Sequence, residues 1–189
     1  MNNSLFNLVD TICELMDRAG IVYAITGSLA SSAHGEVYAS VDVDVCLFAS
    51  SSALDAFLRS LPSRFYHDDD AIRDAAIRES IINITDNQTG WKVDLSFLPR
   101  EGYLAGVLSR RKKVRYGLEG KLYWTVSAED IVLMKLLWRK ETRSQKQWEN
   151  ALSVARIQGV RLDWAFLHHW ADQLGMREDL ERLKREAGI

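Results

Sequence analysis

The stretch VDVDVCLF at residues 41–48 decides how this chain folds. Apolar and polar residues alternate along it, which is the period of two that marks a β-strand. Asp42 and Asp44 therefore point to one face of the strand, while the valines between and beside them point to the other. Residues two apart on a strand are separated by roughly 6.6 Å. The two carboxylates thus share one small volume.

The residues before this stretch predict a strand, a tight turn and a short helix. Residues 21–26 are typical of a short buried strand, and Gly27 and Ser28 follow it directly. The small residues at 29–34 then form a helix that Gly35 ends. An amphipathic helix over residues 5–18 opens the chain, and Gly20 terminates it as a C-terminal cap would.

A third carboxylate is expected on a later strand. Residues 81–84 begin a strand, the polar residues 86–90 form a hairpin turn, and residues 91–98 return. In the returning strand the apolar residues 91, 93, 95 and 97 share one side, and Lys92, Asp94 and Ser96 share the other. Asp94 therefore faces away from the apolar side, as Asp42 and Asp44 do.

The remaining pattern is helical. Helices are expected over residues 51–61 and 71–78, and Ser127 begins a capping box that leads into an apolar helical stretch. Further helices follow at residues 148–157, 164–174 and 176–186. The predicted fold class is α/β (α+β): a mixed sheet with flanking helices over residues 1–126, then a helical bundle over residues 127–189 packed on it.

Composition narrows the class of protein. The 189 residues include 24 basic and 26 acidic ones, for a net charge of −2, which argues against binding nucleic acid by bulk charge. Cys13 and Cys46 stand alone among apolar residues and are expected to be buried free thiols in a reducing cytoplasm. No long apolar run or export signal is present, so a cytoplasmic protein without a membrane partner is expected.

The three aspartates predict a metal site. Carboxylates held this close repel one another unless a proton or a cation compensates them. Ligands that offer only oxygen suit Mg²⁺ or Mn²⁺ rather than zinc. Three such groups on neighbouring strands can hold two metal ions about 4 Å apart, the geometry used in phosphoryl and nucleotidyl transfer. Gly27 and Ser28 open a helix, where backbone N–H groups can bind phosphate.

Together these residues resemble the signature of the polymerase-beta-type nucleotidyltransferase superfamily. The signature is a Gly-Ser turn (Gly27 and Ser28), an Asp-x-Asp strand (Asp42 and Asp44) and a later third aspartate (Asp94). The resemblance implies that the three aspartates are catalytic and bind Mg²⁺ or Mn²⁺. It also implies that the Gly-Ser turn holds the tail of an NTP such as ATP, and that the third aspartate activates an acceptor hydroxyl.

Nearly the whole chain also resembles small bacterial nucleotidyltransferase-like proteins related to AbiEii-type toxins. The stretches GSLASSAHGE at residues 27–36 and SQKQW at residues 144–148 are the basis of this resemblance. It implies a toxin-like transferase with an RNA, tRNA, protein or small-molecule acceptor and an antitoxin-type protein partner. Two positions depart from that group's pattern: Tyr38 replaces an arginine, and Gln147 replaces an aspartate.

Two further basic features are candidates for binding: Lys135 and the run at residues 110–115. Lys135 is assigned to nucleotide binding, because relatives have helical groups in this region that touch the triphosphate. The basic run at residues 110–115 can guide an RNA backbone, although such runs are more often solvated faces. Two alternatives to an enzyme stay open: a catalytically silent nucleotide-binding or protein-interaction module of the same fold, and a structural protein whose aspartates are only solvated.

Overall fold

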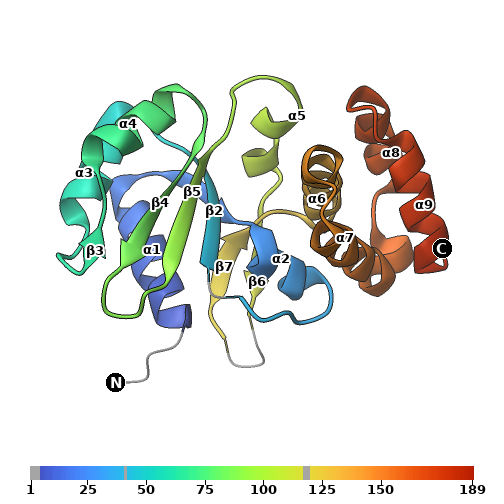
Figure 1. Ribbon diagram of the computed structural model, residues 1–189, viewed down its shortest axis with the longest axis horizontal. Helices are drawn as coiled ribbons and strands as arrows, with labels where there is room; N and C mark the ends of the chain where they lie inside the picture. Colours follow the sequence, from blue (N-terminus) through green and yellow to red (C-terminus); the bar gives the residue numbers. More distant parts are fainter. Residues whose placement is uncertain (1–4, 41, 117–119) are drawn as a thin grey trace.

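The computed structural model describes residues 5–40, 42–116 and 120–189. Helices and strands are mixed up to residue 125, and helices follow to the end (Figure 1). The strands are β1 (Val22–Ile25), β2 (Asp42–Phe48), β3 (Phe65–Tyr66), β4 (Ile81–Asp86), β5 (Lys92–Phe97), β6 (Lys112–Arg115) and β7 (Leu122–Thr125). The helices among them are α1 (Leu5–Ala19), α2 (Gly27–His34), α3 (Ser51–Ser60), α4 (Asp69–Ile77), α5 (Gly102–Ala105) and the 3-10 turn η1 (Val107–Ser109).

These strands form one mixed sheet in the described part of the chain. Their order across it is β3-β4-β5-β2-β1-β7-β6. β2 pairs in parallel with β5, and β1 with β7, while the other neighbours are antiparallel. The two aspartate strands therefore lie side by side at the centre, which brings their polar faces together.

Each face of the sheet packs against a different set of helices. Val43, Val45 and the other apolar residues of that face pack with α1, α3 and α4. The opposite face of β2, which includes Cys46, packs with the C-terminal helices. In Figure 1 α1 lies behind β4 and β5, and no helix crosses the front of these two strands. The polar face of β5 is therefore left open.

The C-terminal helices form the second half of the molecule. They are α6 (Ala128–Thr142), α7 (Gln145–Gln158), the 3-10 turn η2 (Gly159–Arg161), α8 (Trp164–Gln173) and α9 (Arg177–Ala187). Ser127 caps α6 by accepting a hydrogen bond from the Asp130 N–H at 3.0 Å. Trp148 donates from its indole to Glu186 at 3.0 Å, which ties α7 to α9. No helix of the described residues is long and apolar enough to cross a membrane.

The predicted fold class is confirmed, and most predicted elements lie within a few residues of the observed ones. Cys13 and Cys46 are buried free thiols, as expected. The prediction lacked β3, β6 and β7. β6 falls within the basic run, whose charges obscure its strand character, and it is an edge strand, where lysines are common. Val41, the predicted start of β2, lies outside the described residues.

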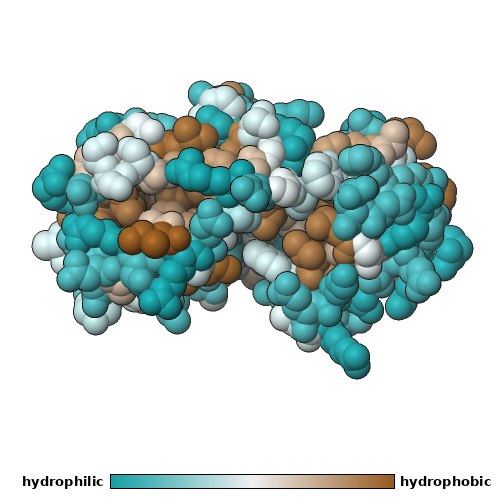
Figure 2. Space-filling view, turned by 90° about the horizontal axis from the view of Figure 1, so that it is seen from above, coloured by the Kyte–Doolittle hydropathy of each residue, from teal (hydrophilic) through white to brown (hydrophobic). Residues whose placement is uncertain are grey.

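The upper face of the molecule is mostly hydrophilic (Figure 2). Apolar side chains gather toward the left of this view, over the end of the sheet where α3 and α4 lie. Ile77 and Ile81, at the junction of α4 and β4, are 82% and 57% exposed. β4 therefore presents solvent-accessible side chains on the face that no helix covers.

Candidate active site

The register of β2 and β5 places two aspartates side by side. Asp44 pairs with Asp94, and Val43 pairs with Val93, which is buried with it on the opposite face. Paired residues of neighbouring strands point to the same face, about 5 Å apart. Asp42 lies two residues before Asp44 and shares that face. The structure thus brings together the three carboxylates named from the sequence.

Gly27 fits the turn beside this cluster because it has no side chain. Its φ of +62° lies in the left-handed region that favours glycine. A Cβ at this position would overlap the carboxylate of Asp44. Asp44 therefore lies directly against the backbone turn that opens α2.

Ser28 continues the turn and contacts the same carboxylate. Its backbone N–H donates a hydrogen bond to Asp44, and its side chain is 8% exposed. The Ser31 hydroxyl donates to the Gly27 carbonyl at 2.8 Å, which secures the first turn of α2. The backbone N–H groups of this turn are the part of the chain that can bind phosphate oxygens.

Two lysines supply positive charge from the helical half. Lys135 of α6 is only 3% exposed, and it attracts Asp44 electrostatically. Burial lowers the pKa of Lys135 to about 8, although the negative charge of Asp44 opposes that shift. Lys146 at the start of α7 acts on both groups, because it favours the charged form of Asp44 and disfavours that of Lys135.

The carboxylates disfavour one another's charge. Burial raises the pKa of Asp44 above its ordinary value, and Asp42 raises it further, while Lys135 and the Ser28 N–H lower it. Burial likewise raises the pKa of Asp94, with added repulsion from Asp44 and Asp42. No hydrogen bond or ion pair from the described residues reaches the carboxylate of Asp94. A cation placed among the three would relieve this repulsion.

The aspartate side chains offer the kind of ligand atom that a hard divalent ion prefers, but they are not yet arranged around an ion. Among the described residues, no three His, Cys, Asp or Glu side chains are already arranged as a metal site. The donors that face the cluster are nevertheless oxygens, which suit Mg²⁺ or Mn²⁺. Burial, with added repulsion between the carboxylates, raises the pKa of Asp44 and of Asp94, and a bound cation would favour their charged forms.

The histidines His34 and His168 lie apart from the aspartates and have partners of their own. His34 hydrogen-bonds the Val126 carbonyl at 2.9 Å, and His168 lies 3.1 Å from Glu181. Lys146 joins the cluster, yet the sequence singled out only Lys135 there. The sequence indicates a role for Lys146 only weakly, because an exposed lysine on a helix is usually only solvated.

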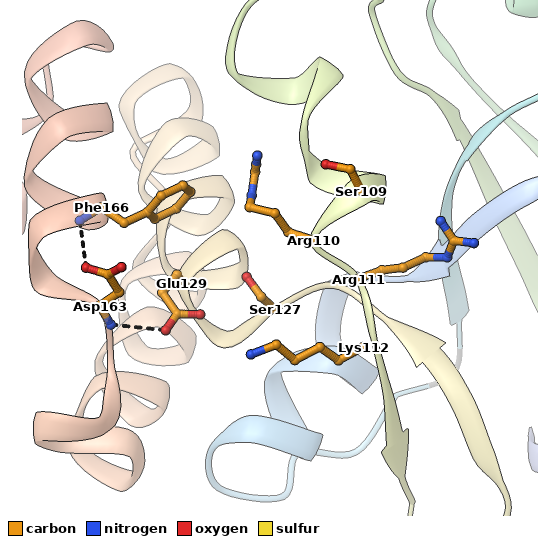
Figure 3. Close-up of a pocket in the computed structure, with 8 residues that line it drawn as sticks. All are labelled: Ser109, Arg110, Arg111, Lys112, Ser127, Glu129, Asp163 and Phe166. Atoms are coloured by element: carbon orange, nitrogen blue, oxygen red, sulfur yellow. Dashed lines mark hydrogen bonds between the residues drawn. The ribbon is translucent and has the colours of Figure 1, made fainter.

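The basic run lines a separate pocket of about 410 Å³ (Figure 3). Its lining residues are Ser109, Arg110, Arg111, Lys112, Ser127, Glu129, Asp163 and Phe166. Lys112 and Glu129 point toward each other from opposite sides, whereas Arg111 points away. None of the residues in the aspartate cluster lines this pocket. The run therefore does not contribute to the aspartate site.

Comparisons with known proteins identify the fold. No family model and no curated protein matches the chain. The solution structure of the antibiotic-resistance factor ANT(2'')-Ia resembles it with a TM-score of 0.63 and 14% identity, over 96% of this chain and 99% of that one.

An antigenic nucleotidyltransferase-like protein from Paracoccidioides brasiliensis resembles it with a TM-score of 0.56 and 17% identity, over 98% and 94%. Identities this low establish likeness of fold alone. The chain has a nucleotidyltransferase-like fold, in which a mixed sheet is followed by helices.

Proposed function

We propose that this chain is a divalent-metal-dependent nucleotidyltransferase that moves a nucleoside monophosphate from an NTP to an acceptor hydroxyl. The observation that supports this most is the position of Asp44. It lies against Gly27 of the phosphate-type turn and in register with Asp94. Metal-dependent transfer to phosphorus needs a carboxylate that is close both to the groups that bind the phosphates and to a second carboxylate. Asp44 is close to both.

Each residue has a defined part in the proposed transfer. The Gly27 backbone and the Ser28 hydroxyl hold the β- and γ-phosphates, and Lys135 adds a positive charge beside them. The acceptor oxygen loses its proton to the Asp94 carboxylate and forms a bond to the α-phosphorus. The bond from that phosphorus to the β-phosphate oxygen breaks, and pyrophosphate leaves with the electron pair.

Asp42, Asp44 and Asp94 would hold the Mg²⁺ or Mn²⁺ ions. When bound, these ions neutralise the charge that develops on the attacking and leaving oxygens. The contribution of the chain itself is alignment: the cradle turn and the third aspartate lie on opposite sides of Asp44. Such positioning accounts for a large part of the rate in reactions of this type.

The acceptor of the proposed transfer is specified only by its chemical class. A small molecule is the first candidate, because the antibiotic-resistance factor matches the chain along almost the full length of both proteins. RNA, including tRNA, and a protein hydroxyl remain the other candidates, as the resemblance to AbiEii-type toxins predicts. That resemblance also predicts a cytoplasmic, toxin-like role with an antitoxin-type partner, and this stays a prediction.

A labelling experiment tests the proposal. The purified chain is incubated with each α-labelled NTP and Mg²⁺, together with total RNA, cell protein or a panel of small molecules that carry hydroxyl groups. We expect label in one of these fractions, and none with Asp44→Asn. Calorimetry with the same NTPs separates the alternative: a silent binding module would bind NTP but label nothing, and a chain with solvated aspartates would bind no NTP in a metal-dependent way.

A further inference from the structure

The charged and polar groups of the site lie in a line across the sheet. Lys135 approaches Asp44 from the helical half, and Asp44 pairs with Asp94 on the next strand. Asp94 in turn pairs with Asn83 on β4, the strand after that. Neighbouring strands are about 4.8 Å apart. The line therefore runs from a buried positive end to an uncharged end at the surface.

The uncharged end is open and its side chains are unused. Asn83 is exposed, and no hydrogen bond from the described residues reaches its side chain or that of Ser96. Ser96 follows Asp94 by two residues on the same face of β5. No helix crosses this part of the sheet in Figure 1. Asn83 is exposed and Asp94 and Ser96 are partly exposed, so solvent reaches this face of β4 and β5.

The ends of the line have different chemistry. The triphosphate needs positive charge and free backbone N–H groups, and both lie at α2 and α6. In an in-line displacement the attacking oxygen approaches opposite the leaving pyrophosphate. The acceptor must then enter from the side of Asp94 that faces β4. Asn83 is the residue of β4 directly opposite Asp94 on that side.

We propose that Asn83, with Ser96 beside it, is the acceptor-binding seat of this enzyme, and that it selects an acceptor in which a second hydrogen-bonding group adjoins the reacting hydroxyl. This inference rests on the proposed transfer function. The Asn83 amide offers two donors and an acceptor oxygen, so it can bind a neighbouring hydroxyl or amine. Unlike a fourth carboxylate, it adds no negative charge to the three aspartates.

A plainer role for Asn83 is that of a solvated strand residue. Asparagine is disfavoured in strands, however, and this one is directly opposite Asp94 rather than at a turn. Its neighbours Ile82 and Ile84 follow the ordinary pattern and pack with the opposite face of the sheet. A residue type that is unusual in strands therefore occupies the position where the proposed transfer needs a polar contact.

Blocking the seat chemically tests the proposal. The native thiols Cys13 and Cys46 are buried, so an introduced cysteine is the reactive one. We compare Asn83→Cys with Asn87→Cys, which replaces an exposed asparagine just beyond β4. Each is treated with a bulky maleimide and assayed with α-labelled NTP, total RNA and a panel of small molecules with and without a second hydrogen-bonding group beside a hydroxyl. Modified Asn83→Cys should lose at least about tenfold in transfer, while modified Asn87→Cys stays within about twofold of its untreated form.

The outcomes separate the seat from the function. Calorimetry should give the same NTP affinity before and after modification, because the nucleotide lies at the other end of the line. If both modified variants transfer equally well, the seat is wrong and the transfer function stands. If untreated protein binds NTP but labels no fraction, the transfer function fails and the seat fails with it.

Truncation gives a second, milder readout. Asn83→Ala should raise the KM for the acceptor about tenfold, with the KM for NTP unchanged. Asn83→Ser, which keeps a hydrogen-bonding group, should recover part of that loss. A structural role would instead change both KM values or neither, and an acceptor KM unchanged in Asn83→Ala would overturn the proposal.

Discussion

The aspartate cluster and the buried Asp130 show two opposite uses of a carboxylate. Asp130 is 0% exposed and is fully partnered. Arg110 donates to it at 2.8 Å, the Tyr103 hydroxyl at 2.9 Å and the Ser127 hydroxyl at 2.8 Å. Asp44, in contrast, accepts from one backbone N–H and has two further aspartates beside it, while Lys135 and Lys146 attract it without a hydrogen bond from either among the described residues.

The difference indicates where a ligand is needed. A buried charge that the chain satisfies itself stabilises the joint between two elements, here η1 and α6. A cluster whose charges repel one another is destabilising by itself, and it persists where a ligand compensates it. Arg110, drawn in Figure 3, therefore has a structural role, whereas the role that we propose for the three aspartates is functional. Four substitutions test this contrast, in order of expected effect.

Asp44→Asn should have the largest effect, and on activity alone. We expect nucleotidyl transfer to fall by about a thousandfold or more, roughly 4 kcal/mol of transition-state stabilisation. The unfolding temperature should stay the same or rise, because the folded chain disfavours the charged form of Asp44. Initial rates and thermal denaturation measure the two effects. A large loss of stability in Asp44→Asn would instead show that Asp44 stabilises the fold, and would contradict the functional role proposed for it.

Asp130→Asn should show the reverse. Loss of the carboxylate leaves Arg110 without its ion-pair partner at a mostly buried joint, which should cost roughly 3 kcal/mol of unfolding free energy. Urea denaturation measures this loss. Transfer activity at 15 °C, where the variant is still folded, should remain within about threefold of the unmodified chain, since Asp130 lies outside the site. Selective loss of activity would contradict the contrast.

Lys135→Met should weaken NTP binding by about tenfold, roughly 1.4 kcal/mol. The pKa of Lys135 is lowered to about 8 in the folded chain, so the unfolded chain binds more protons above that pH. Stability should therefore rise as the pH increases from 8 toward 10.5, and NTP affinity should fall over the same range as the charge is lost.

In Lys135→Met both of these pH dependences should flatten. Calorimetry and urea denaturation at a series of pH values give the two curves. Lys140→Met is the control, because Lys140 is exposed and donates to the Leu174 carbonyl. An unchanged NTP affinity in Lys135→Met would remove Lys135 from the nucleotide site.

Lys112→Ala should have the smallest effect, under about 0.5 kcal/mol in stability. Lys112 is exposed, and no carboxylate of the described residues forms an ion pair with it. Transfer to a small acceptor should be unchanged at all salt concentrations. A loss of transfer to RNA at low salt would instead assign the basic run to an RNA backbone.

Local patterns predicted much of the fold, because the period of a strand or a helix is written in neighbouring residues. The alternation at residues 41–48 and 91–98 correctly placed the three aspartates on polar faces. The register that sets Asp44 beside Asp94 depends on which strands pair, and no local pattern contains that information. β6 was missed because the charges of the basic run obscure its strand pattern, and only its pairing with β7 shows it to be a strand.

The parts of the candidate site that depend on distant contacts could not be predicted. Lys146 and Lys135 come from different helices, and only the packing of the helical half brings their charges to Asp44. Asn83 gave no sequence signal, because its importance lies in being opposite Asp94 on another strand. Ser28 and Gly27 were found from their motif, but their direct contact with Asp44 required the fold.

Helix α2 is fastened at both ends, and this has a mechanical consequence. Its first turn is held against β2 through Asp44. Its last turn is held by α7, where Ser153 accepts from the Glu36 N–H at 2.6 Å and Gln158 donates to the His34 carbonyl at 2.6 Å. Helix α2 therefore connects α7 mechanically to the turn at Gly27. We therefore expect a ligand bound at the turn to stabilise the contacts between α2 and α7. By the same linkage, weakening those contacts should lower the affinity of the turn for its ligand.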